Sequence, residues 1–138
     1  MRVRILVNSL AATDVTAVHS GYARHRKRLL ESGIALHEMR LVAPQSISRR
    51  VGKLGSSDTS LHAKTFAVDR ARVFIGSFNF DPRSANLNTE LGFVIESPAL
   101  ACRIASFFDE TVPEAAYEVH LSASGDLYWT ERESGAIV

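Results

Sequence analysis

Residues 61–79 of this chain read Leu-His-Ala-Lys-Thr-Phe-Ala-Val-Asp-Arg-Ala-Arg-Val-Phe-Ile-Gly-Ser-Phe-Asn. The stretch predicts two strands, over residues 61–68 and 72–75, joined by a tight turn at 69–71. Successive side chains of a strand point to opposite faces, so His62 and Lys64 point the same way. Residues 76–88 then predict a loop that starts next to this pair.

Histidine and lysine on one face suit a phosphate group. The imidazole can attack phosphorus or protonate a leaving oxygen, and the ammonium can neutralise the non-bridging oxygens. Gly76 permits close approach of the backbone, and the side chains of Ser77 and Asn79 supply neutral donors that could reach the same phosphate.

Glu90 opens a further predicted strand, over residues 90–96. A carboxylate there could hold the second imidazole nitrogen and fix the tautomer of the ring. Taken one at a time, these residues have ordinary alternatives. A lone strand histidine is usually structural, Glu90 could be a surface carboxylate, and Ser77 and Asn79 are common turn formers.

Together, the spacing His62-x-Lys64-x4-Asp69-x6-Gly76-Ser77-x-Asn79 resembles the signature of the phospholipase D superfamily. The likeness continues through residues 75–84. Segments 8–14 and 19–24 are similar to the C-terminal half of bacterial cardiolipin-synthase-type members. The resemblance covers nearly the whole chain and weakens after about residue 112.

The resemblance implies an α/β fold, namely a phospholipase-D-like α/β/α sandwich with a mixed, largely parallel sheet. It implies an active site that pairs two such motifs, with one histidine forming a phosphohistidine and the other acting as general acid, and with no cofactor and no metal. Asp69 is expected to secure the turn rather than to take part in the chemistry. The implied site residues are His62, Lys64, Asp69 and Glu90 as catalytic, Lys64, Ser77 and Asn79 as phosphate-binding, and Gly76 as supporting.

We expect residues 1–138 to form a single domain that is the C-terminal half of a two-motif enzyme. A strand over 2–8, a helix from Thr13 or Asp14 to Ser32-Gly33 and a strand over 34–40 predict a parallel pair with a right-handed crossover. The remaining predicted segments are a long basic loop over 41–60, a helix from Ser97-Pro98 to about Glu110, and a terminal β-hairpin over 117–133.

The net charge of +1 conceals an asymmetry. Residues 1–108 carry 15 basic and 8 acidic side chains, whereas residues 109–138 carry 1 and 7. A basic body suits a phosphate-bearing substrate or an anionic surface, although the segregation could also be incidental. The basic run 24–28 is either the solvated face of a helix or a contact for anionic lipid headgroups, and His19 either packs the helix or meets substrate.

No run of about 20 apolar residues is present, and Arg2 and Arg4 interrupt the N-terminal apolar stretch. We therefore expect no transmembrane segment or signal peptide in this chain, and a location that is cytoplasmic or peripheral on the bacterial inner membrane. The single cysteine, Cys102, lies in an apolar stretch and is expected to be a buried, inert thiol.

The leading functional hypothesis is phosphatidyl transfer or phospholipase-D-type hydrolysis on a phosphatidylglycerol-like phospholipid, with peripheral contact to an anionic membrane. One motif supplies one histidine, so activity would need a homodimer or pairing with another half. The alternatives are a single-motif dimeric nuclease, in which nucleic acid replaces lipid, and a catalytically inactive half-domain. An apolar approach to the site would favour lipid, and a continuous basic groove would favour nucleic acid.

Overall fold

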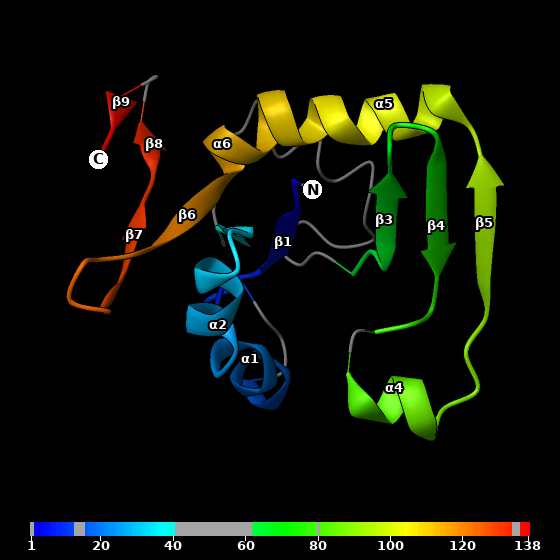
Figure 1. Ribbon diagram of the computed structural model, residues 1–138, viewed down its shortest axis with the longest axis horizontal. Coiled ribbons are helices and arrows are strands. Elements are labelled where there is room, and N and C mark those ends of the chain that lie inside the picture. Colours follow the sequence, from blue (N-terminus) through cyan, green and yellow to red (C-terminus); the bar gives the residue numbers. More distant parts are fainter. Residues whose placement is uncertain (1, 13–15, 41–61, 80, 134–135) are drawn as a thin grey trace. The chain divides into compact units, whose positions relative to one another are not determined.

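The structure, a computed structural model, describes residues 2–12, 16–40, 62–79, 81–133 and 136–138. The chain forms two compact units (Figure 1). The first unit comprises residues 1–61 together with 108–138, and the second comprises residues 62–107. All the predicted site residues belong to the second unit.

The first unit is built on a four-stranded mixed sheet with the strand order β1-β2-β6-β7. Its strands are β1 (Arg4–Asn8), β2 (Ala35–Met39), β6 (Ala116–Leu121) and β7 (Leu127–Thr130). Strands β1 and β2 are parallel, and their connection contains the helices, so the predicted strand–helix–strand unit is confirmed. The pairs β2–β6 and β6–β7 are antiparallel.

The predicted single helix of this unit is divided into α1 (Thr16–Ala23) and α2 (Arg26–Glu31). The division is a tight turn in which the His25 amide donates to the Tyr22 carbonyl at 2.8 Å. Helix α2 and the short helix α6 (Val112–Ala115) both pack on β2 and β6. The core there includes Leu36 and Val119, which face each other across β2 and β6, and Val112.

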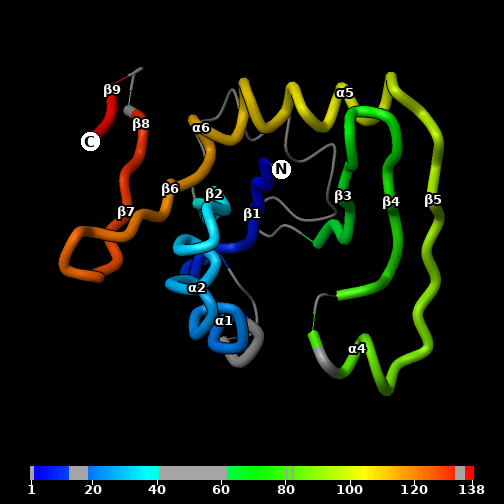
Figure 2. The backbone as a smooth tube through the Cα atoms, in the orientation of Figure 1, coloured from blue at the N-terminus to red at the C-terminus, as the bar shows by residue number. Residues whose placement is uncertain are grey.

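The second unit is an antiparallel meander of β3 (Thr65–Val68), β4 (Arg72–Gly76) and β5 (Gly92–Glu96), which Figure 2 traces as successive up-and-down segments. Asp69, Arg70 and Ala71 connect β3 to β4. The first two have φ of 54° and 52°, and the Ala71 amide donates to the Val68 carbonyl at 3.0 Å. Positive φ at both central positions is typical of the type I′ hairpin turn, so the predicted tight turn is confirmed. Helix α5 (Pro98–Ser106) packs on β3 and β4, and buries Ala101 and Val73.

A short helix, α4 (Pro82–Asn86), lies where the sequence predicted only a loop. The Asp81 side chain accepts from the Arg83 and Ser84 amides at 2.8 and 2.9 Å, and Pro82 occupies the first turn. Aspartate at the N-cap followed by proline is a helix-start signal, and it explains the difference. The predicted helix from Ser97-Pro98 continues past α5 as a π-helical turn, Phe107–Thr111.

The α/β class and the mixed sheet are confirmed. Among the described strands, parallel pairing is confined to β1 and β2, so the sheet is less parallel than expected. The chain ends in a small antiparallel pair, β8 (Arg132–Glu133) and β9 (Ala136–Ile137). The predicted loop over 41–60 lies outside the described residues.

The prediction that Cys102 is buried is wrong, because the thiol is exposed. The neighbouring Ala101 takes the buried position of α5, and the next residue of a helix is rotated by about 100° from it. Within the described ranges, no helix is long and apolar enough to cross a bilayer.

Candidate active site

His62 and Lys64 meet just before β3. Lys64 Nζ lies 2.9 Å from His62 Nε2 and 3.3 Å from the His62 carbonyl oxygen. An ammonium group has only donors, so Nε2 is the atom that can accept in this contact. The His62 side chain is exposed and Lys64 is half-buried, so both can reach a ligand from solvent.

The β3–β4 hairpin brings the second half of the motif next to this pair. The Gly76 amide donates to the Lys64 carbonyl at 3.2 Å, which extends the ladder beyond the end of β3. Gly76 also faces Gly92 on β5. A β-carbon at Gly76 would lie 2.6 Å from the Leu91 carbonyl oxygen and 2.7 Å from a ring carbon of Phe74. The glycine is therefore required by close packing, as its predicted supporting role implies.

Ser77 directly follows β4, and Glu90 lies two residues before β5 begins. The Ser77 hydroxyl donates to Glu90 Oε2, and it accepts from the Leu91 amide at 3.1 Å. Asn88 Nδ2 donates to the other Glu90 oxygen at 3.3 Å. The Ser77 hydrogen bond is the main cause that lowers the pKa of Glu90, and the nearby Lys64 ammonium adds to it. These contacts favour the ionised form of the Glu90 carboxylate.

The expected contact between Glu90 and the imidazole is not made in this arrangement. Glu90 accepts from Ser77 and Asn88, and Ser84 is a further hydrogen-bonding neighbour that lowers its pKa, whereas the His62 ring contacts Lys64. The structure thus brings together two adjoining pairs, His62 with Lys64 and Ser77 with Glu90. The charge of Lys64, which acts on Glu90, links them.

Asn79 follows Ser77 closely in the chain, whereas Asp69 lies at the far end of β3 from Lys64. Asn79 is exposed two residues after Ser77, and its carbonyl accepts from the Asp81 amide at 2.8 Å. Asp69 sits in the turn at the opposite end of β3, roughly 17 Å from Lys64 at the rise of a strand. The motif aspartate is thus placed as a turn residue, away from the rest of the predicted site.

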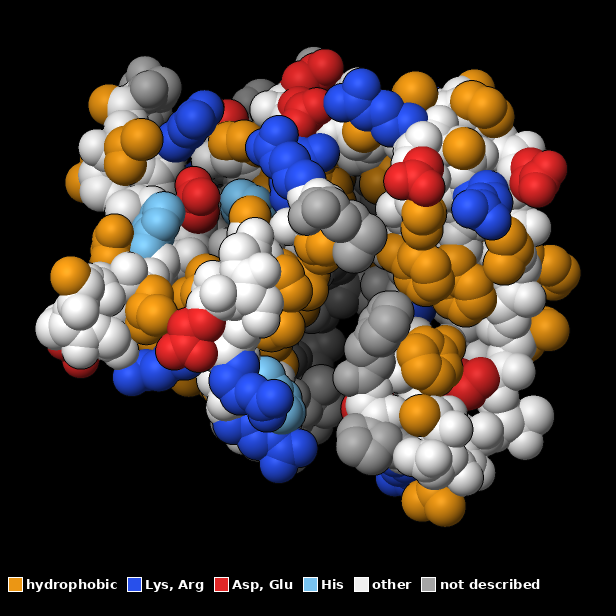
Figure 3. Space-filling model, viewed as in Figure 1, with side chains coloured by type: hydrophobic (Ala, Val, Ile, Leu, Met, Phe, Trp, Pro, Cys, Tyr) orange, Lys and Arg blue, Asp and Glu red, His pale blue; other side chains and the backbone are white. Residues whose placement is uncertain are grey.

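Apolar side chains share the face of the sheet that carries His62 and Lys64. Phe66 and Val68 follow on the same face of β3, and both are 40% exposed. Phe66 stacks on Phe74 of β4, with ring centroids 4.8 Å apart, and Val94 of β5 is 70% exposed in the same row. Figure 3 shows hydrophobic side chains gathered over this sheet. The row that contains Phe66, Phe74 and Val94 is therefore apolar, whereas the row of Val68 continues with the charged Arg72 and Glu96.

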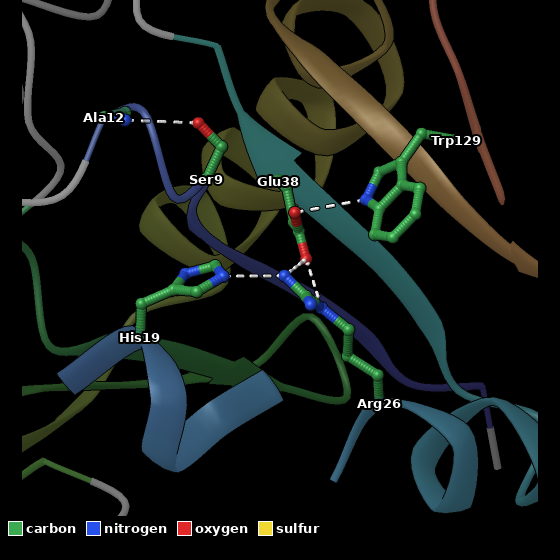
Figure 4. A network of polar contacts seen from close by, with 6 residues as sticks. All are labelled: Ser9, Ala12, His19, Arg26, Glu38 and Trp129. Atoms are coloured by element: carbon green, nitrogen blue, oxygen red, sulfur yellow. Dashed lines mark hydrogen bonds and ion pairs between the residues drawn. The ribbon is translucent and has the colours of Figure 1, made fainter. Parts of the chain in front are cut away.

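The first unit contains a buried polar network that the sequence did not reveal. Arg26 of α2 lies 2.7 Å from Glu38 of β2, with side chains only 12% and 4% exposed. Trp129 Nε1 donates to Glu38 at 3.1 Å, and Arg26 also reaches His19 Nε2 at 2.7 Å (Figure 4). Glu38 within the strand predicted over 34–40 was the signal that could have identified it. His19 is buried, as expected for a residue that packs the helix.

This buried network changes the pKa of the neighbouring Tyr22. Burial, followed by the charge of Glu38, raises the pKa of Tyr22 to about 12. The guanidinium of Arg26 lies over the Tyr22 ring at 5.1 Å. Three other residues of the basic run, Arg24, Lys27 and Arg28, are exposed, and Figure 3 shows blue side chains gathered over α1 and α2. The run is therefore one buried arginine and three solvent-facing cations.

Within the described ranges, no three histidine, cysteine, aspartate or glutamate side chains gather as metal ligands would. Lys64 places a positive charge beside His62, which is suited to a phosphodiester.

Comparison with known proteins supports this chemistry. The family model described as "Cardiolipin synthase, PLD-like domain" matches residues 1–112. Cardiolipin synthase C of Escherichia coli (strain K12) is 50% identical over 135 residues, which are 97% of this chain and 28% of that protein. Uncharacterized proteins of Helicobacter pylori strains J99 and 26695 are each 36% identical over 104 residues, which are 75% of this chain and 20% of theirs. The chain thus spans less than a third of the length of these relatives. No solved structure matches it significantly.

Proposed function

This chain belongs to the cardiolipin synthase, PLD-like domain family, and we propose from that premise that it supplies one half of an active site for phosphatidyl transfer. The observation that carries the proposal is the contact between Lys64 Nζ and His62 Nε2 at 2.9 Å, next to the loop that bears Asn79. This arrangement offers a nucleophile or acid, a cation and a neutral donor to one phosphate group.

The chemistry requires two imidazoles. One attacks phosphorus and forms an N–P bond, while the bond to the leaving alcohol oxygen breaks and the second imidazolium gives that oxygen its proton. An acceptor alcohol, or water, then attacks phosphorus and passes its proton to the second imidazole, and the N–P bond breaks. His62 provides one of the two groups. The other comes from a second copy of this chain or from a partner half that carries the same motif.

The surroundings of His62 favour a lipid over a nucleic acid. Phe66 and Val94 on its face are apolar and exposed, and the charged residues of that face, Arg72 and Glu96, lie in the row of Val68 at the far end of β3. A groove for a polyanionic strand would instead be lined by cations along its length. The substrate that fits is a phosphodiester with an apolar body attached, as in a phosphatidylglycerol-like phospholipid.

Peripheral contact with an anionic membrane is part of the same proposal. Arg24, Lys27 and Arg28 form a basic surface on and next to α2, hereafter the α2 cations. Each basic residue near an anionic bilayer contributes about 1 kcal/mol of attraction. These side chains would hold the protein at the surface from which its substrate is drawn.

The proposal is tested by presenting the purified chain with vesicles of phosphatidylglycerol and, in parallel, with single-stranded and double-stranded DNA. Glycerol release with formation of a diphosphatidyl product is the expected result, and the Lys64→Met variant should lack it. Cleavage of DNA without reaction on lipid would replace the proposal with the nuclease alternative.

A further inference from the structure

Trp129 is an exposed aromatic side chain on β7, the strand at one end of the first unit's sheet, and it is the single tryptophan of the sequence. It is 42% exposed. Its indole N–H, the one polar group of the side chain, donates to the buried Glu38 at 3.1 Å (Figure 4). Because this donor points into the protein, the exposed part of the indole is hydrocarbon.

The indole borders the α2 cations. The Arg26 guanidinium of α2 lies over the Trp129 ring, 5.4 Å from its centroid. Arg26 is followed in the helix by the exposed Lys27 and Arg28. Helix α2 packs on β2 and β6, and β7 is the next strand of the same sheet. The cations and the exposed indole therefore lie on the same side of this sheet.

Apolar side chains continue the face of β7 that carries the indole. Leu127 lies two residues before Trp129, so it points to the same face, and it pairs with Leu121 of β6. Both leucines are half-buried. Tyr128 points to the opposite face, where it stacks on His120 with ring centroids 4.9 Å apart. The side of β7 next to α2 thus presents an indole and two leucines.

We propose that Trp129 is a membrane anchor, whose ring enters the headgroup region of an anionic bilayer while the α2 cations bind the lipid phosphates. This inference rests on the proposed function, of which it defines the membrane-facing surface. The positive charge of α2 favours an anionic lipid surface, and tryptophan is enriched at membrane–water interfaces. An unpaired indole N–H would cost free energy on leaving water, and the hydrogen bond to Glu38 removes that cost.

The single tryptophan allows a direct test in the unmodified chain. When phosphatidylglycerol vesicles are added, the emission of Trp129 should shift to shorter wavelength and its quenching by acrylamide should fall. Vesicles whose acyl chains carry bromine near the headgroup should quench the emission. Neutral phosphatidylcholine vesicles should cause none of these changes. Replacement of the α2 cations by glutamine should abolish them, because the ring then loses the charges that bring it to the bilayer.

A pair of variants tests the same surface by vesicle sedimentation. Trp129→Ala should weaken binding to phosphatidylglycerol vesicles roughly tenfold, because the exposed indole area no longer leaves water. The matched control Tyr128→Ala removes an exposed aromatic ring from the opposite face, and its affinity should stay within about twofold of the wild type. Circular dichroism shows whether each variant is folded, and the emission of the wild-type chain decides the matter if Trp129→Ala is not.

The proposal is overturned if the chain sediments with phosphatidylglycerol vesicles while the emission and acrylamide quenching of Trp129 stay unchanged. It is equally overturned if single-stranded DNA alters the emission and vesicles do not. Phosphatidyl transfer is measured separately on phosphatidylglycerol dispersed in detergent. Turnover there without a response to vesicles would refute the anchor alone, and a response to vesicles without turnover would count against the proposed function alone.

Discussion

His62 is the residue on which the proposed chemistry depends. Its Nε2 faces the Lys64 ammonium, and its exposed ring can reach substrate. We expect His62→Asn to reduce phosphatidyl transfer by at least about a hundredfold, because asparagine is similar in size but neither forms a stable phospho-adduct nor shuttles a proton. Turnover measured beside an unchanged circular dichroism spectrum checks this, and a folded His62→Asn variant with normal turnover would refute the assignment.

Lys64 is the basis of a second prediction, which concerns whether the activity depends on a metal ion. The positive charge that meets the phosphate is an ammonium, so we expect phosphatidyl transfer to survive an excess of EDTA. The assay is run on one preparation with and without chelator. Activity that is lost with EDTA and restored by a single divalent ion would contradict this chemistry.

The motif spacing singled out His62, Lys64, Ser77 and Glu90, and the structure pairs Lys64 with His62 and Ser77 with Glu90. The spacing could not predict which of these side chains form hydrogen bonds with one another. Whether Glu90 meets His62 or Ser77 depends on how closely β4 and β5 approach at Gly76 and Gly92, and that is a tertiary property. The orienting role of Glu90 toward His62 stays a prediction for the complete site.

At the scale of elements, α2 carries the proposed membrane contact. Replacing the α2 cations Arg24, Lys27 and Arg28 with glutamine should abolish most of the binding to phosphatidylglycerol vesicles, because about 1 kcal/mol of attraction is lost per residue. Binding by the wild type should weaken as salt screens the charges. Vesicle sedimentation measures both effects. Equal binding of the wild type to neutral vesicles would show that the attraction is not electrostatic.

Arg26 lies in the same basic run, but we expect it to stabilise the fold rather than to bind a membrane. Its partner Glu38 is only 4% exposed, so Arg26→Gln leaves a buried carboxylate without its cation. We expect a loss of about 3 kcal/mol in the free energy of unfolding. The matched control Arg28→Gln, at an exposed position, should change it by less than about 0.5 kcal/mol. Urea denaturation compares the two, and equal stability of both variants would show that the buried ion pair contributes nothing.

Hydropathy and turn chemistry predicted most elements of the fold, including the parallel pair β1–β2, the turn at Asp69 and the helix from Ser97-Pro98. The sequence predictions failed at two places, where a short local signal was hidden by the residues around it. The Asp81-Pro82 start of α4 was hidden in a polar stretch. Arg26 resembled its exposed neighbours in sequence, and only the turn at His25 places it against Glu38.

At the scale of the whole molecule, the chain carries one motif where the chemistry needs two histidines. It spans 28% of the length of Escherichia coli cardiolipin synthase C, of which it covers 135 residues. That the 138 residues act as one domain, and that two motifs meet across an interface, are predictions. A symmetric pairing of two copies would bring their two His62 side chains toward one phosphate.

The most direct test is sedimentation velocity of the purified chain, with phosphatidyl transfer measured on the same samples over a range of protein concentrations. We predict that turnover per chain rises with concentration in step with a species of twice the chain mass. If the chain stays monomeric, activity should appear only after a partner half with its own motif is added. Full turnover by a pure monomer would contradict the claim that this chain holds half of an active site.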